Sequence, residues 1–355
     1  MSQFELPDPP NDGITAVKFA PNSSNRLLVS SWDSNVYFYD TTPDEAKLLQ
    51  KFESRAAVLD VTFGRNDNEA FAGGLDWDVR RIDLESGEQT VISEHNAPVN
   101  CVAYSSETNI LVSASFDSTL HIHIIEGAKA TSVSTIQLPH KAYSISLSPS
   151  KLVVAMANRA VYIYDIKTLK DATYRSQTPQ STINVEPWQQ RESSMKFQIR
   201  AVACMPNDSG YASSSIEGRI AVEWFDPSDE SQKRKYAFKC HRSIVENENT
   251  DYVYPVHALA FHPVFGTFAS GGGDGVVAVW DGSAKRRIKQ YTKFGLGVSA
   301  IGFSPDGAFL AIGVSPGLES EHDDGIPVEE GQVKIVVRQL AEEEVKGKGK
   351  DSKKK

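Results

Sequence analysis

A four-residue unit recurs along this chain and constrains its fold more than any other feature. The unit consists of two small residues, one residue of any kind and an aspartate, and an apolar strand follows three residues later. Clear copies stand at residues 30–33, 73–76, 114–117 and 271–274, with blurred copies at 155–158 and 214–217. The last residues of the first four copies, at positions 33, 76, 117 and 158, are 43, 41 and 41 residues apart. A period of about 40–45 residues with several strands per repeat indicates a ring of small β-sheets.

Each repeat can be divided into four strands, with the recurring turn joining the second strand to the third. Where WD repeats carry their namesake dipeptide at the end of a third strand, this chain has Tyr39-Asp40, Tyr164-Asp165 and Trp280-Asp281. Candidate inner strands lie at residues 15–19, 59–63, 100–104, 144–147, 201–204, 257–261 and 299–303. We therefore predict an all-β fold, a seven-bladed WD-repeat β-propeller that forms a single domain over residues 1–340.

The last blade is incomplete at the carboxyl end of the chain. Residues 299–303, 308–314 and 333–337 supply only three strands. We predict that residues 4–6 supply the fourth, because pairing the two ends in one sheet closes the ring and removes an exposed edge. Residues 341–355 are expected to form a disordered basic tail, and its lysines are read either as a nuclear-entry signal or as a solubilising tail.

Three insertions interrupt the period. Residues 166–198 lengthen the approach to blade five, and residues 243–255 enlarge the connection into blade six. Residues 315–332 form an acidic segment that splits blade seven, and we interpret this segment as a solvated loop.

The aspartate of the recurring turn has a structural role. It can accept hydrogen bonds from the turn backbone and from a histidine in the loop that enters the same blade. We expect such bonds between His95 and Asp117 and between His241 and Asp274, whereas His140 faces Asn158. Since the sequence has no phosphate-binding loop, nucleophile elbow or metal-ligand spacing, we expect no enzyme activity, no cofactor and no metal.

The three cysteines, Cys101, Cys204 and Cys240, are widely separated and odd in number. This usage argues against a disulfide framework and for a reducing compartment. Cys240 stands beside His241, and two interpretations stay open: a nucleophile–base pair, or a strand cysteine before a turn histidine.

The charge of the chain is unevenly distributed. The net charge is −9, and six lysines and one aspartate in residues 346–355 leave −14 on residues 1–345. Neutralising phosphates supplies most non-specific affinity for nucleic acid, so this acidic body is not expected to bind nucleic acid directly. The amino terminus lacks the features of a secretory signal, and no apolar run approaches the ~20 residues that span a bilayer. We expect a soluble intracellular protein with no membrane partner.

In propellers of this kind, the turns between second and third strands and the loops between blades share one face, here called the top rim. Trp32 and Phe116 precede the turn acids of blades one and three, and Trp77 follows the turn acid of blade two. Large aromatic side chains at water-facing turns favour a surface that a partner covers. The alternative is that each packs on its neighbouring blade.

Four cations also map to the top rim, at blades five and six. Arg219 lies in the turn of blade five, Arg200 opens its inner strand, Lys239 closes its outer strand, and Arg242 begins the following loop. Converging cations on an acidic protein favour the capture of one anion, such as a phosphate or a carboxylate-rich peptide. The alternative is that they pair with the glutamates of blade five, Glu217 and Glu223.

Longer segments resemble the spindle-checkpoint propeller of the Bub-three family, and the resemblance covers nearly the whole chain. The similar segments are residues 12–19, 29–33, 73–76, 191–194, 214–223 and 235–242. The motifs Ser-Ser-Ile-Glu-Gly-Arg at 214–219 and Lys-Tyr-Ala-Phe-Lys-Cys-His-Arg at 235–242 are far more specific than a WD pattern. The related propeller of messenger-RNA export, which binds a nucleoporin, shares the fold and part of these motifs.

The resemblance implies a non-enzymatic adaptor of the spindle-assembly checkpoint. Members of the family hold the GLEBS motif of checkpoint kinases and kinase-like proteins across the top rim. The complex then docks on phosphorylated Met-Glu-Leu-Thr repeats of the kinetochore scaffold. This docking recruits the kinases to kinetochores. The implied location is the nucleus, the kinetochore in mitosis and the cytoplasm. The resemblance also implies that the protein is monomeric by itself and works in hetero-complexes. The alternative is an mRNA-export adaptor that binds a nucleoporin GLEBS motif.

Individual roles follow from the resemblance residue by residue. Arg219 and Lys239 resemble the pair that contacts the phosphothreonine, and Arg242 joins them because it lies nearby. Arg200 resembles the arginine that pairs with a GLEBS glutamate, and Trp32 resembles a top-rim aromatic of the same surface, to which we also assign Phe116 and Trp77. The chain departs from the family in three places: Phe116 stands where many relatives carry tryptophan, blade four lacks its turn aspartate, and residues 176–185 look inserted.

Overall fold

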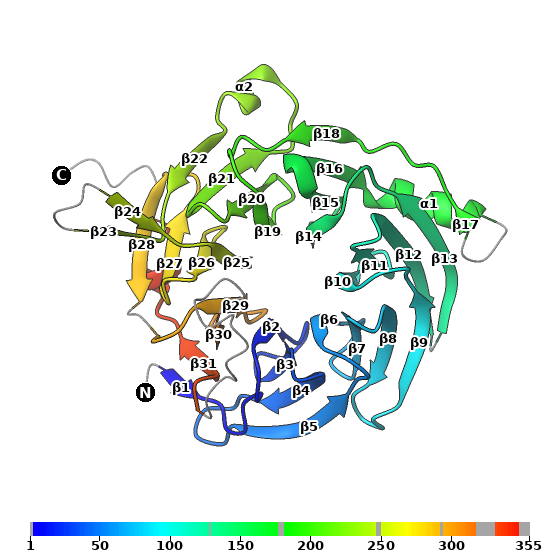
Figure 1. The fold of residues 1–355 in the computed structure, drawn as a ribbon, viewed down its shortest axis with the longest axis horizontal. Coiled ribbons are helices and arrows are strands. Elements are labelled where there is room, and N and C mark those ends of the chain that lie inside the picture. Colours follow the sequence, from blue (N-terminus) through cyan, green and yellow to red (C-terminus); the bar gives the residue numbers. More distant parts are fainter. Residues whose placement is uncertain are drawn as a thin grey trace.

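The computed structural model describes residues 3–127, 129–176, 181–245, 250–291, 294–316 and 331–347. Seven antiparallel sheets stand around a central axis, so the predicted seven-bladed β-propeller is confirmed (Figure 1). In blades one to six the strand nearest the axis comes first in the sequence. Blade seven differs, because the amino-terminal strand of the whole chain is its outermost strand.

Blades one to three take their four main strands from residues 14–137. Blade one comprises β2 (Ile14–Phe19), β3 (Arg26–Ser31), β4 (Asn35–Asp40) and β5 (Lys47–Glu53). Blade two comprises β6 (Val58–Phe63), β7 (Glu69–Gly74), β8 (Asp78–Asp83) and β9 (Gln89–Glu94). Blade three comprises β10 (Val99–Ser105), β11 (Ile110–Ser115), β12 (Thr119–Glu126) and β13 (Lys129–Gln137).

Blades four to six follow in the same order around the ring. Blade four comprises β14 (Ala142–Leu147), β15 (Lys151–Met156), β16 (Ala160–Asp165) and β18 (Gln189–Glu192). Blade five comprises β19 (Ile199–Cys204), β20 (Gly210–Ser215), β21 (Arg219–Trp224) and β22 (Tyr236–Lys239), with the short helix α2 (Asp229–Gln232) between its last two strands. Blade six comprises β25 (Val256–Phe261), β26 (Phe268–Gly272), β27 (Val277–Asp281) and β28 (Arg286–Tyr291).

Both ends of the chain build blade seven. Its strands are β29 (Val298–Phe303), β30 (Phe309–Val314), β31 (Lys334–Gln339) and β1 (Gln3–Glu5). Phe4 pairs with Val337, and the Leu6 amide donates to the Ile335 carbonyl at 2.9 Å. The prediction that the amino-terminal strand closes the ring is therefore confirmed, and this pairing covers the edge that β31 would otherwise expose.

The insertions contain structure that the repeat pattern does not predict. Residues 166–198 include the helix α1 (Ile166–Arg175), whose first turn is capped by Asp165 accepting from the Thr168 amide at 3.0 Å. The strand β17 (Ser181–Thr182) then joins blade three beside β13. Residues 243–255 contain most of a hairpin, β23 (Arg242–Val245) and β24 (Thr250–Val253). Of the acidic segment, residues 317–330 lie outside the described residues.

The boundary predicted for the carboxyl-terminal tail is wrong. The helix α3 (Glu342–Val345) forms where disorder was expected to begin, and Val345 is buried against blade six. The Thr267 hydroxyl donates to the Val345 carbonyl at 2.7 Å, and Glu344 pairs with Arg338 and Lys289 at 3.2 Å. The composition of this segment did not predict the helix, because the helix is stabilised by one apolar side chain and by tertiary ion pairs. The basic residues 348–355 lie outside the described residues.

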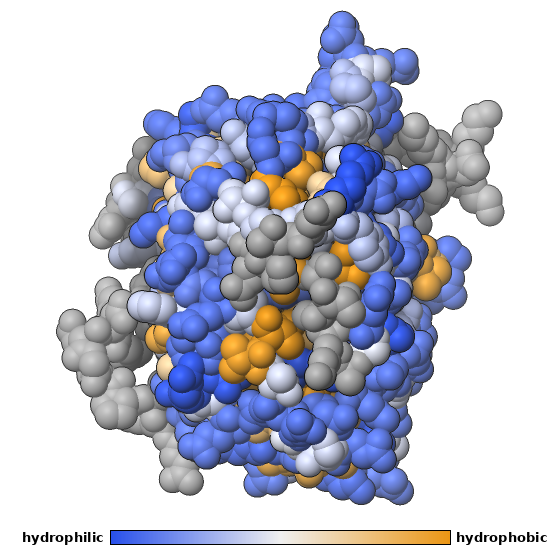
Figure 2. Space-filling model, turned by 90° about the vertical axis from the view of Figure 1, so that its right-hand side faces the viewer, coloured by the Kyte–Doolittle hydropathy of each residue, from blue (hydrophilic) through white to orange (hydrophobic). Residues whose placement is uncertain are grey.

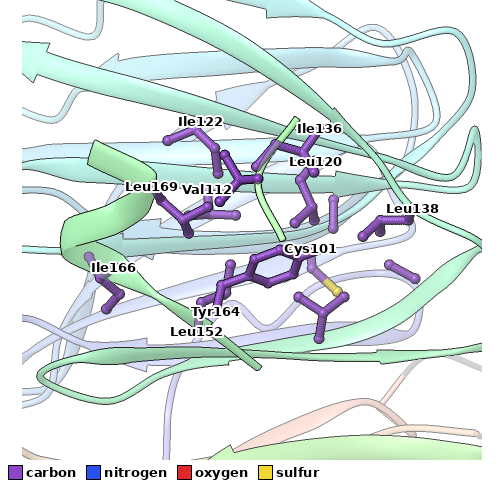
Figure 3. Close-up of a cluster of buried hydrophobic side chains, with 14 of the residues drawn as sticks. Cys101, Val112, Leu120, Ile122, Ile136, Leu138, Leu152, Tyr164, Ile166 and Leu169 are labelled. Atoms are coloured by element: carbon purple, nitrogen blue, oxygen red, sulfur yellow. The ribbon is translucent and has the colours of Figure 1, made fainter. Parts of the chain in front are cut away.

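Apolar side chains fill the seams between blades. At the seam of blades three and four, Val112, Leu120 and Ile122 pack with Tyr164 of β16 and with Ile166 and Leu169 of α1 (Figure 3). The outer surface on this side of the ring is largely hydrophilic, with small separate hydrophobic areas (Figure 2). The helix α1 thus buries its own apolar face on the ring while leaving a polar surface to solvent.

The predicted histidine–aspartate bonds are present. His95 Nδ1 lies 3.3 Å from Asp117 Oδ2, and His241 Nδ1 lies 2.8 Å from Asp274 Oδ1. In blade four the turn becomes the 3₁₀ helix η1 (Ala157–Arg159), and Asn158 Nδ2 is 3.4 Å from the His140 ring. Burial raises the pKa of Asp117, but hydrogen bonds from His95, Thr119 and the Asn96 amide outweigh burial and hold that pKa well below its usual range.

Blade three also buries two histidines that the sequence pattern does not single out. His121 stacks on His95 with 3.6 Å between ring centroids, and His123 Nε2 lies 2.7 Å from Ser93 Oγ. Burial lowers the pKa of both His121 and His123 to about 3. Both rings are therefore neutral in the folded protein near pH 7.

Shortening a side chain at the ring closure should destabilise the propeller. Leu6 is buried between blade one and blade seven, so Leu6→Ala should lower the free energy of unfolding by about 2–4 kcal/mol. Glu5→Ala, which removes only an exposed contact to Lys334, is the matched control and should cost less than about 0.5 kcal/mol. Equal urea midpoints for Leu6→Ala and the unaltered protein would show that this closure contributes nothing.

The buried histidines should make blade three sensitive to acid. In the unfolded chain a histidine has a pKa near 6.5, so it becomes protonated below that pH. In the folded protein the two buried histidines stay neutral until the pH falls to about 3, so the unfolded state binds more protons between these pH values. Stability should therefore fall by up to about 1.4 kcal/mol per pH unit for each of the two histidines as the pH drops below about 6.5. Urea unfolding at pH 7.5 and 5.5 should show a smaller pH dependence for His121→Asn. His140→Asn, at a partly exposed site, should keep the original dependence, and an unchanged slope in His121→Asn contradicts this account.

Candidate binding sites on the propeller rim

Arg219 and Lys239 form a cross-strand pair of cations in blade five. They are register partners on the neighbouring antiparallel strands β21 and β22. Side chains at such positions leave the same face of the sheet with their Cβ atoms about 4.5–5.5 Å apart. Like charges placed directly opposite each other destabilise a sheet. The pair therefore has an electrostatic cost that a bound anion would remove.

Part of this cost is offset inside the protein. Arg219 Nε lies 3.4 Å from Glu217 Oε2, while the side chain of Lys239 is exposed and has no hydrogen bond or ion pair with any described residue. Glu223 does not take part, because its carboxylate is buried near Arg191 at 3.4 Å and Lys235 at 3.6 Å. The alternative of glutamate pairing is thus correct for Arg219 with Glu217 and wrong for Glu223.

The turn that carries Arg219 is held tightly against the following loop. Gly218 has a φ of +64°, and a Cβ atom there would stand 2.7 Å from the Cys240 carbonyl and 3.0 Å from the His241 carbonyl. The Cys240 amide donates to the Gly218 carbonyl at 2.9 Å. Only glycine can adopt the left-handed conformation without strain and also allow the two carbonyl oxygens to approach so closely. This packing fixes the distance between the turn and the end of β22.

Arg242 lies beside this turn and is held by it. Its Nη2 donates to the Glu217 carbonyl at 2.9 Å, and its Nη1 lies 3.7 Å from Asp251 on β24. Its Nε is buried and has no hydrogen-bond partner among the described residues. The structure therefore brings Arg219, Lys239 and Arg242 together through Glu217 and Gly218.

Arg200 is at the same end of blade five but nearer the central axis. It lies on β19, two strands inward from β21, which is about 10 Å at the usual strand spacing. Its Nε is 3.4 Å from His257 Nδ1, and burial together with the Arg200 charge lowers the pKa of His257 to about 3. His257 is therefore neutral at pH 7. Arg200 and the outer three cations are separate features of the rim.

A cleft opens beside Lys239, between the outer edge of blade five and blade six. Its volume is about 240 Å³. Its lining comprises Lys239, Cys240, His241, Arg242, Asp274, Val276, Ala278, Trp280, Arg287 and Gln290. Sequence reasoning missed the contribution of β27 and β28, because only the ring places these strands against the end of β22.

The three predicted aromatics lie in different environments. Trp32 is half-buried and approaches Gly13, and Phe116 meets Tyr143 of blade four edge-to-face with 6.4 Å between ring centroids. Trp77 is 44% exposed and has a φ of +69°. The equivalent positions in the other turns hold Ser34, Ser118, Arg159, Gly218 and Gly275, also with positive φ. A bulky residue in this conformation is strained by about 1–2 kcal/mol, so Trp77 is retained at a conformational cost.

The nucleophile interpretation of Cys240 and His241 is wrong. The two His241 ring nitrogens bond Asp274 Oδ1 and Ser270 Oγ, each at 2.8 Å, so neither is left for the thiol. Burial raises the pKa of the Cys240 thiol to about 12, which keeps it protonated. Among the described residues no group of three or more His, Cys, Asp or Glu side chains is placed to hold a metal ion. No helix in the described ranges is long and apolar enough to cross a membrane.

Comparison with known proteins agrees with this architecture. The WD domain, G-beta repeat family model matches residues 3–40, 87–123 and 235–281. The mitotic checkpoint protein BUB3.1 of Arabidopsis thaliana is 42% identical over 98% of this chain and 95% of its own length. The mitotic checkpoint protein bub3 of Dictyostelium discoideum is 36% identical over 92% of each chain. The mRNA export factor GLE2 of Chaetomium thermophilum is 32% identical over 88% of this chain and 84% of its own length.

The fold, the rim motifs of blade five and the full-length similarity to several checkpoint proteins agree with one another. This chain belongs to the Bub3 family of WD-repeat β-propellers.

Proposed function

We propose that this protein is a non-enzymatic adaptor of the spindle-assembly checkpoint that joins a GLEBS-containing checkpoint kinase to a phosphorylated kinetochore scaffold. Four relatives that span most of the chain are named as mitotic or spindle checkpoint proteins, which supports the checkpoint role. The protein works in the nucleus and cytoplasm and at the kinetochore in mitosis, as the propeller subunit of a hetero-complex. It needs no cofactor and does not contact nucleic acid directly.

The observation that carries this proposal is the cross-strand pair of Arg219 and Lys239. A phosphothreonine has a charge of about −1.5 to −2 at pH 7 and three acceptor oxygens. The planar guanidinium of Arg219 meets two of these oxygens, and the Lys239 ammonium acts as a point charge beside them. Binding relieves the repulsion between the two cations, and an unphosphorylated threonine provides no charge to do so.

Arg242 contributes to this site by its charge near the pair and does not contact the phosphate directly. Its guanidinium bonds the Glu217 carbonyl and adds a third positive charge beside the pair. Glu217 holds Arg219 in place in the free protein and would have to share it with the phosphate. The phosphorylated Met-Glu-Leu-Thr repeat is the ligand proposed for this site.

The GLEBS segment is proposed to lie across the top rim from Arg200 to the aromatics of blades one to three. Arg200 supplies the cation for a GLEBS glutamate near the central axis, and Trp32 and Phe116 supply half-buried apolar contacts. Trp77 is the exposed anchor of this surface, because strain of the backbone and exposure of an indole together indicate a residue kept for binding.

Removing either cation of the pair should abolish the preference for phosphothreonine. Arg219→Ala and Lys239→Ala should each weaken binding of a phosphorylated Met-Glu-Leu-Thr peptide about tenfold or more, since a charged hydrogen bond contributes about 1.5–3 kcal/mol. Isothermal titration calorimetry with phosphorylated and unphosphorylated peptides, with and without GLEBS peptide, measures this. Lys233→Ala changes the net charge equally at an exposed site off the rim and should have no effect. If both rim variants bind as tightly as the unaltered protein, the phosphate assignment is wrong.

Changing the strained tryptophan should separate stability from GLEBS binding. Trp77→Gly removes the indole but suits a positive φ, so the melting temperature should stay the same or rise. Affinity for a GLEBS peptide should fall about tenfold, as for a typical interface anchor. Trp188→Gly changes a tryptophan of similar exposure, 45%, on blade four and should leave GLEBS affinity unchanged. Equal GLEBS affinities for these two variants would remove Trp77 from the interface.

The mRNA-export relative motivates one alternative, an adaptor that binds a nucleoporin GLEBS motif. Affinity capture from mitotic cells separates the two functions. A checkpoint kinase together with the kinetochore scaffold supports the checkpoint role, whereas a nucleoporin without any kinetochore protein supports export.

A further inference from the structure

We propose that Glu217 is a movable counter-ion, which leaves Arg219 when a phosphate binds and pairs with Arg242 instead. This inference rests on the proposed phosphothreonine function and extends it. Glu217 and the phosphate compete for one arginine, and the exchange removes that competition. Glu217 is thus a positioning residue, since it acts on the phosphate only through the two arginines.

The turn acid of blade five does not make the contact that fixes its counterparts in other blades. Asp33, Asp117 and Asp274 each accept a hydrogen bond from the backbone amide two residues further along, at 2.8–3.2 Å. Among the described residues, the Glu217 carboxylate accepts no such bond from the Arg219 amide and contacts the Arg219 side chain instead. Its extra methylene carries the carboxylate past the turn backbone. The turn therefore does not hold this side chain in place.

The contact that holds Glu217 in the free protein is loose. Its Oε2 lies 3.4 Å from Arg219 Nε, whereas a charged hydrogen bond is usually about 2.7–2.9 Å long. The side chain is only 14% exposed, and its Oε1 is buried without a hydrogen-bond partner among the described residues. A buried carboxylate oxygen that lacks a partner destabilises the arrangement in which it stands. A rearrangement that gives Oε1 a donor is therefore favoured.

A donor for this oxygen is available on Arg242. The Nη2 atom of Arg242 donates to the Glu217 carbonyl at 2.9 Å, so the guanidinium already lies beside this residue. Its Nε is buried and also lacks a hydrogen-bond partner within the part of the chain that the structure describes. Asp251 approaches Nη1 at 3.7 Å and leaves Nε unoccupied. Two buried atoms without partners, one a donor and the other an acceptor, thus belong to neighbouring side chains.

Phosphate binding supplies the driving force for the exchange. A phosphothreonine brings a charge of about −1.5 to −2 to the pair of Arg219 and Lys239. A carboxylate that stayed at Arg219 would repel this charge and occupy one of the arginine donors. On moving to Arg242, the carboxylate frees Arg219 for the phosphate and gives both unpartnered atoms a partner. An aspartate could not move in this way, because the turn amide would hold it as in blades one, three and six.

A double-mutant cycle tests the exchange in the full-length protein bound to GLEBS peptide. The probe is a phosphorylated Met-Glu-Leu-Thr peptide, titrated by isothermal calorimetry. Arg242→Gln should weaken its binding about five- to tenfold, because Glu217 then stays at Arg219. Glu217→Gln removes the competing charge and should bind the peptide about two- to fivefold more tightly. In the Glu217→Gln background, Arg242→Gln should weaken binding less than about twofold.

A charge-conserving variant separates the movement of Glu217 from its charge. Glu217→Asp keeps the negative charge but places the carboxylate where the Arg219 amide can hold it. Arg242→Gln should therefore weaken binding less than about twofold in this background as well. Arg234→Gln is the matched control for the arginine change. Arg234 packs over the Trp224 ring at 4.4 Å, beyond the other end of β21, and its loss should weaken binding in no background.

Nuclear magnetic resonance of arginine side chains follows the exchange in the unaltered protein. With isotope-labelled arginine, the Nε–H signal of Arg242 should move downfield when phosphorylated peptide binds, because it forms a charged hydrogen bond. The same signal should stay in place in Glu217→Gln. A loss of stability in an arginine variant does not affect this measurement.

The outcomes separate this inference from the function on which it rests. If Arg242→Gln weakens binding equally with glutamate, glutamine or aspartate at position 217, Arg242 acts by charge alone and the exchange is overturned. An Arg242 Nε–H signal that does not move on peptide binding also overturns the exchange, and the phosphothreonine function stands in both cases. If the unaltered protein binds phosphorylated and unphosphorylated peptides equally, the phosphothreonine function fails, and the exchange fails with it.

Discussion

The conformation of the residue after each turn acid determines where the rim side chains of this propeller lie. In blades one, two, three, five and six this residue has a positive φ, which reverses the chain within one step and returns it as the third strand. In blades one, three and six the turn acid also accepts hydrogen bonds from the loop that enters the blade, as Asp274 does from His241. Most copies satisfy the geometry with serine or glycine, so their only role is to hold the fold.

Function is proposed where a copy departs from this rule. Blade two places Trp77 in the strained position, and blade five follows its glycine directly with Arg219. Both departures carry a cost, one in backbone strain and the other in repulsion between like charges. A folded protein has little reason to retain either cost unless another molecule offsets it. The proposed sites therefore coincide with strained or repulsive features of the chain itself as well as with motifs of its family.

Tertiary packing makes the outer rim of blade five a single unit. Gly218 lets the turn lie against the backbone of Cys240 and His241, and Arg242 returns from the next loop to bond the Glu217 carbonyl. The phosphate pair, the third cation and the cleft are therefore joined through a few rigid contacts. Arg200 stands apart near the axis, which separates the proposed peptide surface from the proposed phosphate site.

The repeat period, the small residues of each turn and the strand patterns were enough to determine seven blades and the pairing of the two chain ends. They also located Arg219 and Lys239 at the same end of blade five, because strand order and turn position are local properties that recur every 40–45 residues. The helices α1 and α3, the buried His121 and His123, and the correct partner of Glu223 were decided only by tertiary structure. Each depends on contacts between segments far apart in the sequence, which no local pattern encodes. The cleft is the clearest case, since Trp280 and Arg287 line it together with Lys239 only because the fold sets blade six beside blade five.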